Sequence, residues 1–304
     1  MTEPPHVLVV GNVNVDMIMG PLQPWPQAGT EVVMPEYELR VGGSAGNAAL
    51  ALAALGVPFR LLANAGDDVL GRWLRDSFGP AALHWRLTER PTTVSVGVTH
   101  PNGERTFLTN AGHLEELGPE DVLPHVDKIA PAGSVALLCG AFLSPPLVAA
   151  LGEILSELKA AGSRVALDTG WPPAGWTHAV RSSLAEWLPA TDLLLFNEAE
   201  AFALSREEEV DRAVPLIREM LPFDATLVVK RGADGASAWR REETATHRAP
   251  TIVVADSIGA GDVFNAGFLA ADMREEPLRD ALAAGVKFAS TVIATHPRRY
   301  EVGV

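Results

Sequence analysis

The segment 256–262, with the sequence Asp-Ser-Ile-Gly-Ala-Gly-Asp, combines a glycine-rich turn, an acid and the start of a helix-patterned run. The backbone N–H groups of Gly259, Ala260 and Gly261 would have no partner within such a helix. The helix dipole adds partial positive charge at the same place, so the turn favours a bound anion. Asp262 is a poor ligand for an anion, because like charges repel, but it is well placed to take a proton from a hydroxyl that attacks a bound phosphate. The segment predicts an anion hole beside a general base.

A purely structural interpretation is also open, in which Asp256 and Asp262 are helix caps and the glycines only let the chain turn sharply. A second cluster, segment 42–47 with the sequence Gly-Gly-Ser-Ala-Gly-Asn, stands at another expected strand-to-helix junction. Its first two glycines would let a ligand lie against bare backbone, with Asn47 one turn inside the helix, or they would only form a flexible turn. Local sequence leaves both alternatives open at both segments.

The second half of the chain has the regular pattern that would position the first of these segments. Apolar runs alternate with helix-patterned runs, which predicts a mainly parallel sheet wound on both faces by helices. Ser205 and Glu208 have the spacing of a capping box, so the acidic run at 207–209 is interpreted as a helix start and not as a metal site. Expected strands are Val135–Leu138, Val165–Asp168, Leu193–Phe196 and Thr226–Lys230, expected helices are Pro146–Ala161, Ala179–Trp187, Glu198–Leu204, Glu207–Leu221 and Ala281–Ile293, and a hairpin joins Ala236–Trp239 to Thr246–His247.

The first 110 residues are less regular. After a strand over His6–Val10, polar and apolar residues alternate, so Asn14 and Asp16 share one face of an extended segment. The other expected elements are an extended run over Thr30–Val41, an Ala-rich helix over Ser44–Leu55, and the strands Thr92–Thr99 and Thr106–Thr109 joined by a Pro-Asn-Gly turn. We therefore expect a single α/β domain over residues 1–304, with a small β-sheet lid formed by approximately residues 12–41 and 91–110.

Composition excludes several classes of function. The 304 residues with 47% hydrophobic content suffice for a large core, and the formal net charge of −14 argues against nucleic acid or an anionic membrane as a partner. No signal peptide or membrane-spanning stretch is recognisable, so we expect a cytoplasmic protein. Cys139 stands in an apolar run and is expected to be buried. No Gly-Lys dipeptide occurs and no Gly-x-Gly-x-x-Gly follows the first strand, so neither a P-loop nor a dinucleotide fold is supported.

Together, the two glycine segments resemble the signatures of the ribokinase-like (PfkB) carbohydrate kinase family, and the resemblance extends over nearly the whole chain. It implies a ribokinase-like fold, with a doubly wound, mainly parallel sheet and a protruding β lid. It also implies that Asp262 is the catalytic base and that the turn Gly259–Gly261 is the anion hole. The residues that would bind the sugar are Asn14, Asp16, Gly42, Gly43 and Asn47.

The resemblance further implies a nucleotide side, with ATP and Mg²⁺ as cofactors. The segment 197–200, with the sequence Asn-Glu-Ala-Glu, is similar to the family's Asn-x-x-Glu motif. In that motif Asn197 would contact the ATP phosphates, and Glu200 would orient Mg²⁺ through its water ligands. Taken alone, Glu200 would pass for a solvated helix residue.

Two more segments are assigned by the resemblance. Lys230, Gly232 and Gly235 are similar to the nucleotide-binding turn after a late strand, and Ser290 is a candidate neighbour of adenine. Asp256 is a candidate ligand of a monovalent cation such as K⁺. In family members a Gly-Ala-rich loop beyond the last helix helps to hold this cation, and residues 295–300 do not match that loop, so activation by K⁺ stays open.

The resemblance favours an ATP-dependent kinase that phosphorylates a hydroxyl, expected to be primary, of a small sugar such as ribose. A nucleoside is the alternative acceptor, because the lid segments could form an apolar slot for a base. The same side chains equally suit a lid core or a homodimer contact through the lid. These residues are Met17, Met19, Trp25 and Phe107.

Two other functions rank lower. A phosphorylated sugar would require a cluster of basic residues, and the lid segments offer mainly Arg40 and Arg105. A sensor or scaffold that keeps the fold but has lost catalysis is disfavoured, because Asp262 is retained beside intact glycines.

Overall fold

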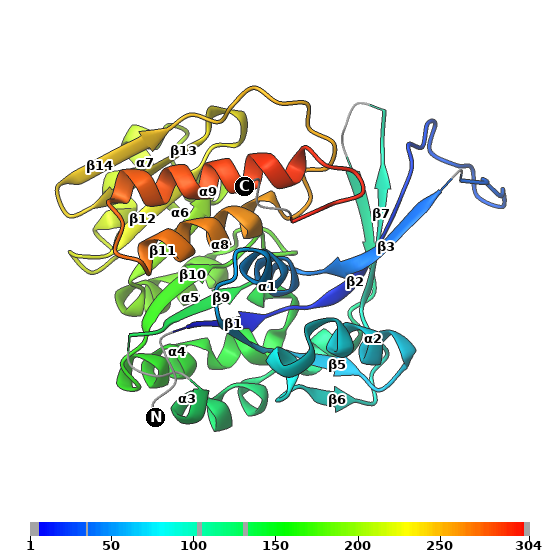
Figure 1. Cartoon of the computed structure of the whole chain (residues 1–304), viewed down its shortest axis with the longest axis horizontal. Helices are drawn as coiled ribbons and strands as arrows, with labels where there is room; N and C mark the ends of the chain where they lie inside the picture. Colours follow the sequence, from blue (N-terminus) through cyan, green and yellow to red (C-terminus); the bar gives the residue numbers. More distant parts are fainter. Residues whose placement is uncertain (1–5, 35, 102–104, 130–132, 301–304) are drawn as a thin grey trace.

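The protein is built around an eight-stranded sheet with the strand order β14-β13-β12-β11-β10-β9-β1-β4 (Figure 1). The computed structural model describes residues 6–34, 36–101, 105–129 and 133–300. The strands from β4 to β12 in this order run parallel, and an antiparallel hairpin, β13 and β14, completes one edge. The strands are β1 (Val7–Gly11), β4 (Phe59–Leu62), β9 (Val135–Cys139), β10 (Arg164–Asp168), β11 (Leu193–Asn197), β12 (Thr226–Lys230), β13 (Ala236–Arg240) and β14 (Glu243–His247).

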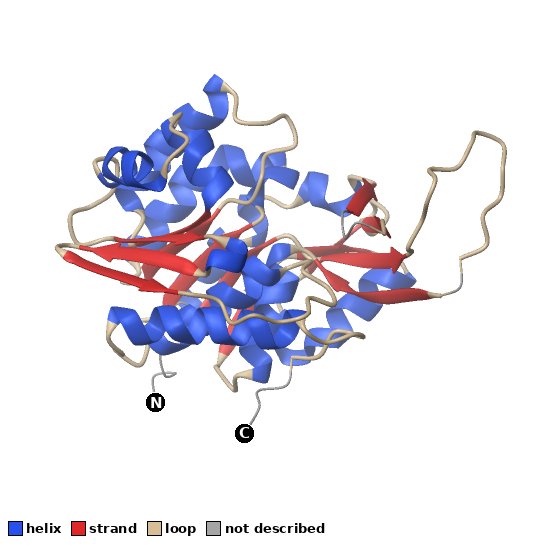
Figure 2. Cartoon of the chain, turned by 90° about the horizontal axis from the view of Figure 1, so that it is seen from above, coloured by secondary structure: helices blue, strands red, loops and turns tan. Residues whose placement is uncertain are grey.

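Helices lie on both faces of this sheet, as Figure 2 shows. Successive side chains of a strand point to opposite faces, so a strand covered on both sides must be apolar throughout. In β1, for example, Val7 and Val9 join one core and Leu8 and Val10 join the other. The first core is covered by α1 (Ser44–Ala54), α2 (Val69–Phe78), α8 (Ala260–Asp272) and α9 (Leu278–Ile293), and the second by α3 (Leu123–Ile129), α4 (Pro145–Ala160), α5 (His178–Trp187), α6 (Glu198–Ser205) and α7 (Val210–Arg218).

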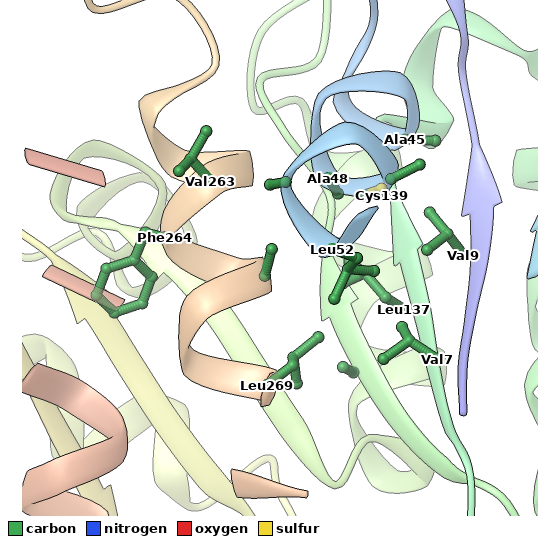
Figure 3. Packing of buried hydrophobic residues seen from close by; sticks show 14 of the residues in the cluster. Val7, Val9, Ala45, Ala48, Leu52, Leu137, Cys139, Val263, Phe264 and Leu269 are labelled. Carbon is green, nitrogen blue, oxygen red and sulfur yellow. The ribbon is translucent and has the colours of Figure 1, made fainter. Parts of the chain in front are cut away.

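Close packing between α1 and α8 fixes the position of both glycine segments. Figure 3 shows Ala48 and Leu52 of α1 beside Val263 of α8, over Val9 and Leu137 of the sheet. All five side chains are fully or almost fully buried. Small alanine side chains let α1 come close to α8, and tight packing resists displacement. The first turns of both helices are therefore held together above the carboxyl edge of the sheet.

A second, four-stranded sheet protrudes beyond the carboxyl edge of the main one (Figure 1). Its order is β3-β2-β7-β8, with β2 and β7 parallel and the other pairs antiparallel. The Asn102-Gly103 part of the expected hairpin turn lies outside the described residues. The strands are β2 (Asn14–Met19), β3 (Tyr37–Gly42), β7 (Val94–Thr99) and β8 (Arg105–Thr109), and a short pair, β5 (Asn64–Gly66) and β6 (Arg86–Thr88), lies apart from them.

The predicted α/β class, with a mainly parallel sheet and a smaller separate sheet, is confirmed, and several local predictions are wrong. Among the described residues of the expected extended run Thr30–Val41, the strand begins only at Tyr37 and continues to Gly42, and β4 and α2 were not predicted. Ser205 does not cap a new helix: it ends α6, and its hydroxyl donates to the carbonyl of Ala201 at 2.8 Å. The next helix, α7, begins only at Val210. Among the described helices, none is long and apolar enough to cross a membrane.

Candidate active site

A cavity of about 670 Å³ lies at the carboxyl edge of the main sheet and brings together the residues expected on the nucleotide side. Its walls come from the ends of β10, β11 and β12, the first turn of α8, and α9. The open α/β architecture commonly places ligand sites at this edge, because the strand ends leave a crevice there. The predicted residues that line it are Asn197, Glu200, Lys230, Gly232, Gly235, Gly259, Ala260, Gly261, Asp262 and Ser290.

Asn197 and Glu200 form the capping box that starts α6. The Asn197 side chain accepts from the Glu200 N–H at 2.9 Å, and the Glu200 carboxylate accepts from the Asn197 N–H at 2.8 Å. This reciprocal pairing fixes the Glu200 side chain at the end of β11. Burial, together with the negative charge of Asp168, raises the pKa of Glu200 to about 7.

Asp168, at the end of β10, is a cavity residue that the sequence analysis missed. Its Oδ2 accepts from Lys230 Nζ at 2.7 Å and from Asn265 Nδ2 at 2.5 Å. Burial alone would lower the pKa of Lys230, but the carboxylates of Asp168 and Glu200 outweigh it and raise that pKa. The sequence did contain a signal for Asp168. The segment Asp-Thr-Gly at 168–170 ends an apolar strand, and parallel strands all end at the same edge of the sheet, where the cavity lies.

The turn before α8 has the geometry of an anion site. Gly259 adopts a left-handed conformation with φ 68, which favours glycine, and the helix begins at Ala260. Asp262 stands in the first turn and is not the N-cap, so the capping alternative fails for this residue. Its Oδ2 accepts from Asn47 Nδ2 at 3.0 Å. Burial is the main cause and the negative charge of Asp168 the second cause that raise the pKa of Asp262 to about 8.

The residues expected on the sugar side come from β2, from the end of β3 and from the start of α1. Asn14 Nδ2 donates to Asp16 Oδ1 at 2.8 Å, and both side chains are buried. Burial raises the pKa of Asp16, while Arg40 opposes the shift. The glycines make room for these side chains. A Cβ atom at Gly42 would overlap the Asp16 carboxylate, and one at Gly43 would lie 2.8 Å from the Asn14 amide oxygen.

Asp256 does not have the surroundings of a cation ligand. Its Oδ2 lies 2.5 Å from Arg40 Nη1 and 2.9 Å from Arg298 Nη2, and its Oδ1 lies 3.2 Å from Arg105 Nη2. Burial would raise the pKa of Asp256, but Arg298 and Arg40 hold it below its usual value. Guanidinium groups already take both carboxylate oxygens and would repel K⁺. The sequence analysis did not single out Arg298, because the residues around it form no recognisable motif.

The apolar slot expected for a nucleobase is only partly assembled. In β2, Met17 and Met19 alternate with Asp16, so they lie on the opposite face of the four-stranded sheet. Trp25 is 53% exposed and lies against His100, with ring centroids 6.1 Å apart. Phe107, in β8, shares the face of Arg105, which is two residues away.

Comparison with known proteins agrees with this geometry. The family model for the pfkB family carbohydrate kinase matches residues 4–300. The chain belongs to this family. The pfkB-family enzyme is a carbohydrate kinase, as predicted from the two glycine segments, and kinases of this family use ATP.

Individual relatives differ in the substrates that their names state. The pfkB-family chain is 31% identical over 282 residues to an ATP-dependent ribose-1-phosphate kinase of Halopiger xanaduensis, covering 91% of this chain and 88% of the relative. It is 26% identical to an adenosine kinase structure from Sinorhizobium meliloti, with TM-score 0.79 and coverage of 97% and 95%. A ribokinase of Arabidopsis thaliana complexed with ribose and ATP has 22% identity, TM-score 0.78 and coverage of 97% and 94%, and supports the ribokinase-like fold.

Proposed function

We propose that this enzyme transfers the γ-phosphate of ATP to a primary hydroxyl of a small carbohydrate such as ribose, with Asp262 as the general base. The observation that carries the proposal is the position of Asp262 between two sites. It lines the cavity beside the Gly259–Gly261 turn, and its carboxylate is hydrogen-bonded to Asn47 of α1, one of the residues expected to bind the sugar. A base at this junction can reach both a phosphate and a hydroxyl.

In the proposed reaction, Asp16 and Asn14 bind hydroxyls of the acceptor, with Asn47 beside them. Asp262 takes the proton of the attacking hydroxyl as its oxygen bonds to the γ-phosphorus. The bond from that phosphorus to the bridging oxygen breaks, and ADP leaves with the electron pair. The N–H groups of Gly259–Gly261 stabilise the charge on the transferred phosphoryl oxygens.

ATP would enter as its Mg²⁺ complex, held by the cavity. Within the described ranges, no cluster of three or more His, Cys, Asp or Glu side chains forms a metal site on its own. Glu200 and Asp168 suit a cation that arrives with the nucleotide, because burial and mutual repulsion disfavour two neighbouring charged acids. The Mg²⁺ ion would neutralise phosphate charge. Asn197 and Lys230 are proposed to contact the phosphates. The turn with Gly232 and Gly235 is proposed to bind the nucleotide, and Ser290 is proposed to lie beside the adenine.

The test is Asp262→Asn, which keeps the size and the Asn47 hydrogen bond but removes the base. General-base catalysis contributes about 10²–10⁴-fold, so kcat should fall by about that factor while ATP binds nearly as before. The folded-state pKa of Asp262 is raised, so its contribution to stability is lost as pH rises from the ordinary carboxyl range toward 8. The variant should therefore unfold at the same temperature as the parent at pH 7, or higher. Asp76→Asn, at an exposed position of α2, is the charge-matched control. Full turnover by Asp262→Asn would refute the assignment.

Nucleoside kinase activity is a second candidate, supported by the likeness to the Sinorhizobium meliloti adenosine kinase. The position of Met17 and Met19 on the far face of the lid weakens it, because they cannot stack on a base beside Asp16. A non-catalytic sensor would keep ligand binding and release no ADP. A coupled ADP-release assay over ribose, fructose and adenosine separates these functions.

We also propose that residues 1–304 form one domain, that the four-stranded sheet is its lid, and that the enzyme is a cytoplasmic homodimer formed through the lid. The lid face opposite Asp16 supports the dimer, because it exposes Tyr37 (66%), Leu39 (39%) and Leu108 (56%). Apolar patches of this kind mark interaction surfaces. Leu108→Asp should shift a dimer toward monomer in analytical ultracentrifugation. A monomeric parent protein would contradict the proposal.

A further inference from the structure

The loop that leads into α8 places one carboxylate against three arginines from three distant segments. Arg40 comes from β3, Arg105 from β8 and Arg298 from the segment after α9, and all three contact Asp256 within 3.2 Å. The separations along the chain from Asp256 to Arg40 and Arg105 are 216 and 151 residues. The lid strands, the loop before α8 and the segment after α9 meet here and form this cluster, which we call the arginine cluster.

The arginine cluster has more donors than its own contacts use. Among the described residues, the carboxylates that form ion pairs with its three guanidinium groups are Asp256 and Glu38, the latter 3.4 Å from Arg40, and Asp16 acts on Arg40 and Arg298 by its charge. The side chains of Arg298, Arg40 and Arg105 are 3%, 10% and 19% exposed. The Nε atoms of all three and Nη2 of Arg40 are buried without a hydrogen-bond partner. Buried charged donors normally have acceptors, so these indicate a place for another anion.

This cluster adjoins the acceptor side of the reaction site. Asn47 connects the two, because its Nδ2 donates to Asp262 and its Oδ1 accepts from Arg298 Nη1 at 3.5 Å. On the lid, Arg40 is the cross-strand neighbour of Asp16. A molecule in contact with both Asp262 and the cluster therefore needs only the length of a small sugar.

We propose that the acceptor is a sugar monophosphate, with its phosphate bound by Arg40, Arg105 and Arg298 and its free hydroxyl beside Asp262. This assignment rests on the proposed function and names the substrate class of that site. A phosphate dianion has three terminal oxygens and matches guanidinium forks from three directions. A carboxylate has two oxygens and one charge, and an uncharged sugar would leave the buried donors unpaired. In the sequence, the two lid arginines alone seemed too few to bind a phosphorylated sugar. The structure adds Arg298 as the third arginine of the cluster.

The test compares matched acceptors. ADP release is measured with ribose, ribose 1-phosphate, ribose 5-phosphate, fructose, fructose 6-phosphate, gluconate and adenosine, in the parent enzyme and in Arg105→Gln, Arg298→Gln and Arg279→Gln. We expect kcat/KM for a sugar monophosphate to exceed that for its parent sugar by at least about 100-fold. Loss of one charged hydrogen-bonding partner should lower it about 10- to 100-fold in Arg105→Gln and Arg298→Gln. Activity with the unphosphorylated sugar should fall less, so the ratio of kcat/KM for the monophosphate to that for its parent sugar should drop. Arg279, with a side chain 75% exposed on α9, is the control.

Binding separates failure of this assignment from failure of the proposed function. Calorimetry with Asp262→Asn and ADP should show tight binding of the preferred sugar monophosphate, lost in the double variant with Arg298→Gln. Turnover of ribose, gluconate or adenosine in preference to every sugar monophosphate would overturn the assignment while kinase activity stands. Equal losses for phosphorylated and free sugars in the arginine variants would also overturn it, because the arginines would then only hold the lid to the body. Absence of ADP release with tight sugar monophosphate binding would refute the kinase function and retain the anion site.

Discussion

The nucleotide side and the acceptor side of the site are built in different ways. On the nucleotide side, Asp168, Asn197 and Lys230 end three neighbouring parallel strands, so the sheet itself brings them together. On the acceptor side, Asp256 meets side chains from the lid and from the tail. The first side depends on backbone topology, and the second on ion pairs between separate parts. Substitutions should therefore damage the two sides differently.

The largest effect is expected from Lys230→Met on the nucleotide side. Lys230 and Asp168 are 2.7 Å apart, with side chains 12% and 9% exposed. Removing one partner of a buried pair leaves an uncompensated charge and costs about 3–5 kcal/mol. Chemical denaturation should show a loss of that order, and KM for ATP should rise.

Lys159→Met is the matched control for that change. Lys159 and Asp192 are also 2.7 Å apart, but their side chains are 41% and 25% exposed. Exposed pairs contribute about 0–1 kcal/mol, because water screens them. Equal losses of stability in the two variants would show that burial of the cavity pair has no special weight.

The difference between the two sides also explains what the sequence could predict. Asn197 and Lys230 were assigned by their resemblance to family motifs, and each stands at the end of an apolar strand, which marks the carboxyl edge of a parallel sheet. Asp168 follows the same rule and was predictable, although no motif drew attention to it. Arg298 was not predictable from the sequence, because its contacts with Asn47 and Asp256 depend on how the segment after α9 folds back toward the lid.

Local signals failed where two interpretations competed. The Ser205–Glu208 spacing fits a capping box, but Ser205 is still inside α6 and bonds back to Ala201. The true box, Asn197 with Glu200, has the same spacing and directly follows a strand. A capping signal therefore has to be weighed against the end of the preceding helix.

A smaller effect is expected from Gly42→Ala on the acceptor side. A Cβ atom there would overlap the Asp16 carboxylate, so Asp16 must move. Loss of the hydrogen bonds that we propose it makes to the acceptor should raise KM for the acceptor about 10- to 100-fold, with KM for ATP little changed. Gly152→Ala is the control, because no atom lies within 4 Å of the added methyl group. An equal rise in both KM values would mean that the two sides are not independent.

The last prediction is the pH dependence of Asp262, the residue that joins the two sides. A general base acts only when deprotonated, and the pKa of Asp262 is raised to about 8 by burial and by Asp168. At low concentrations of both substrates, where the free enzyme is observed, the rate should fall about tenfold per pH unit below about 8 and level off above it. Glu200, with a pKa raised to about 7, should steepen the profile below that value, and Glu200→Gln should remove the steeper part. A rate independent of pH between 6 and 9 would mean that the proton leaves by another route.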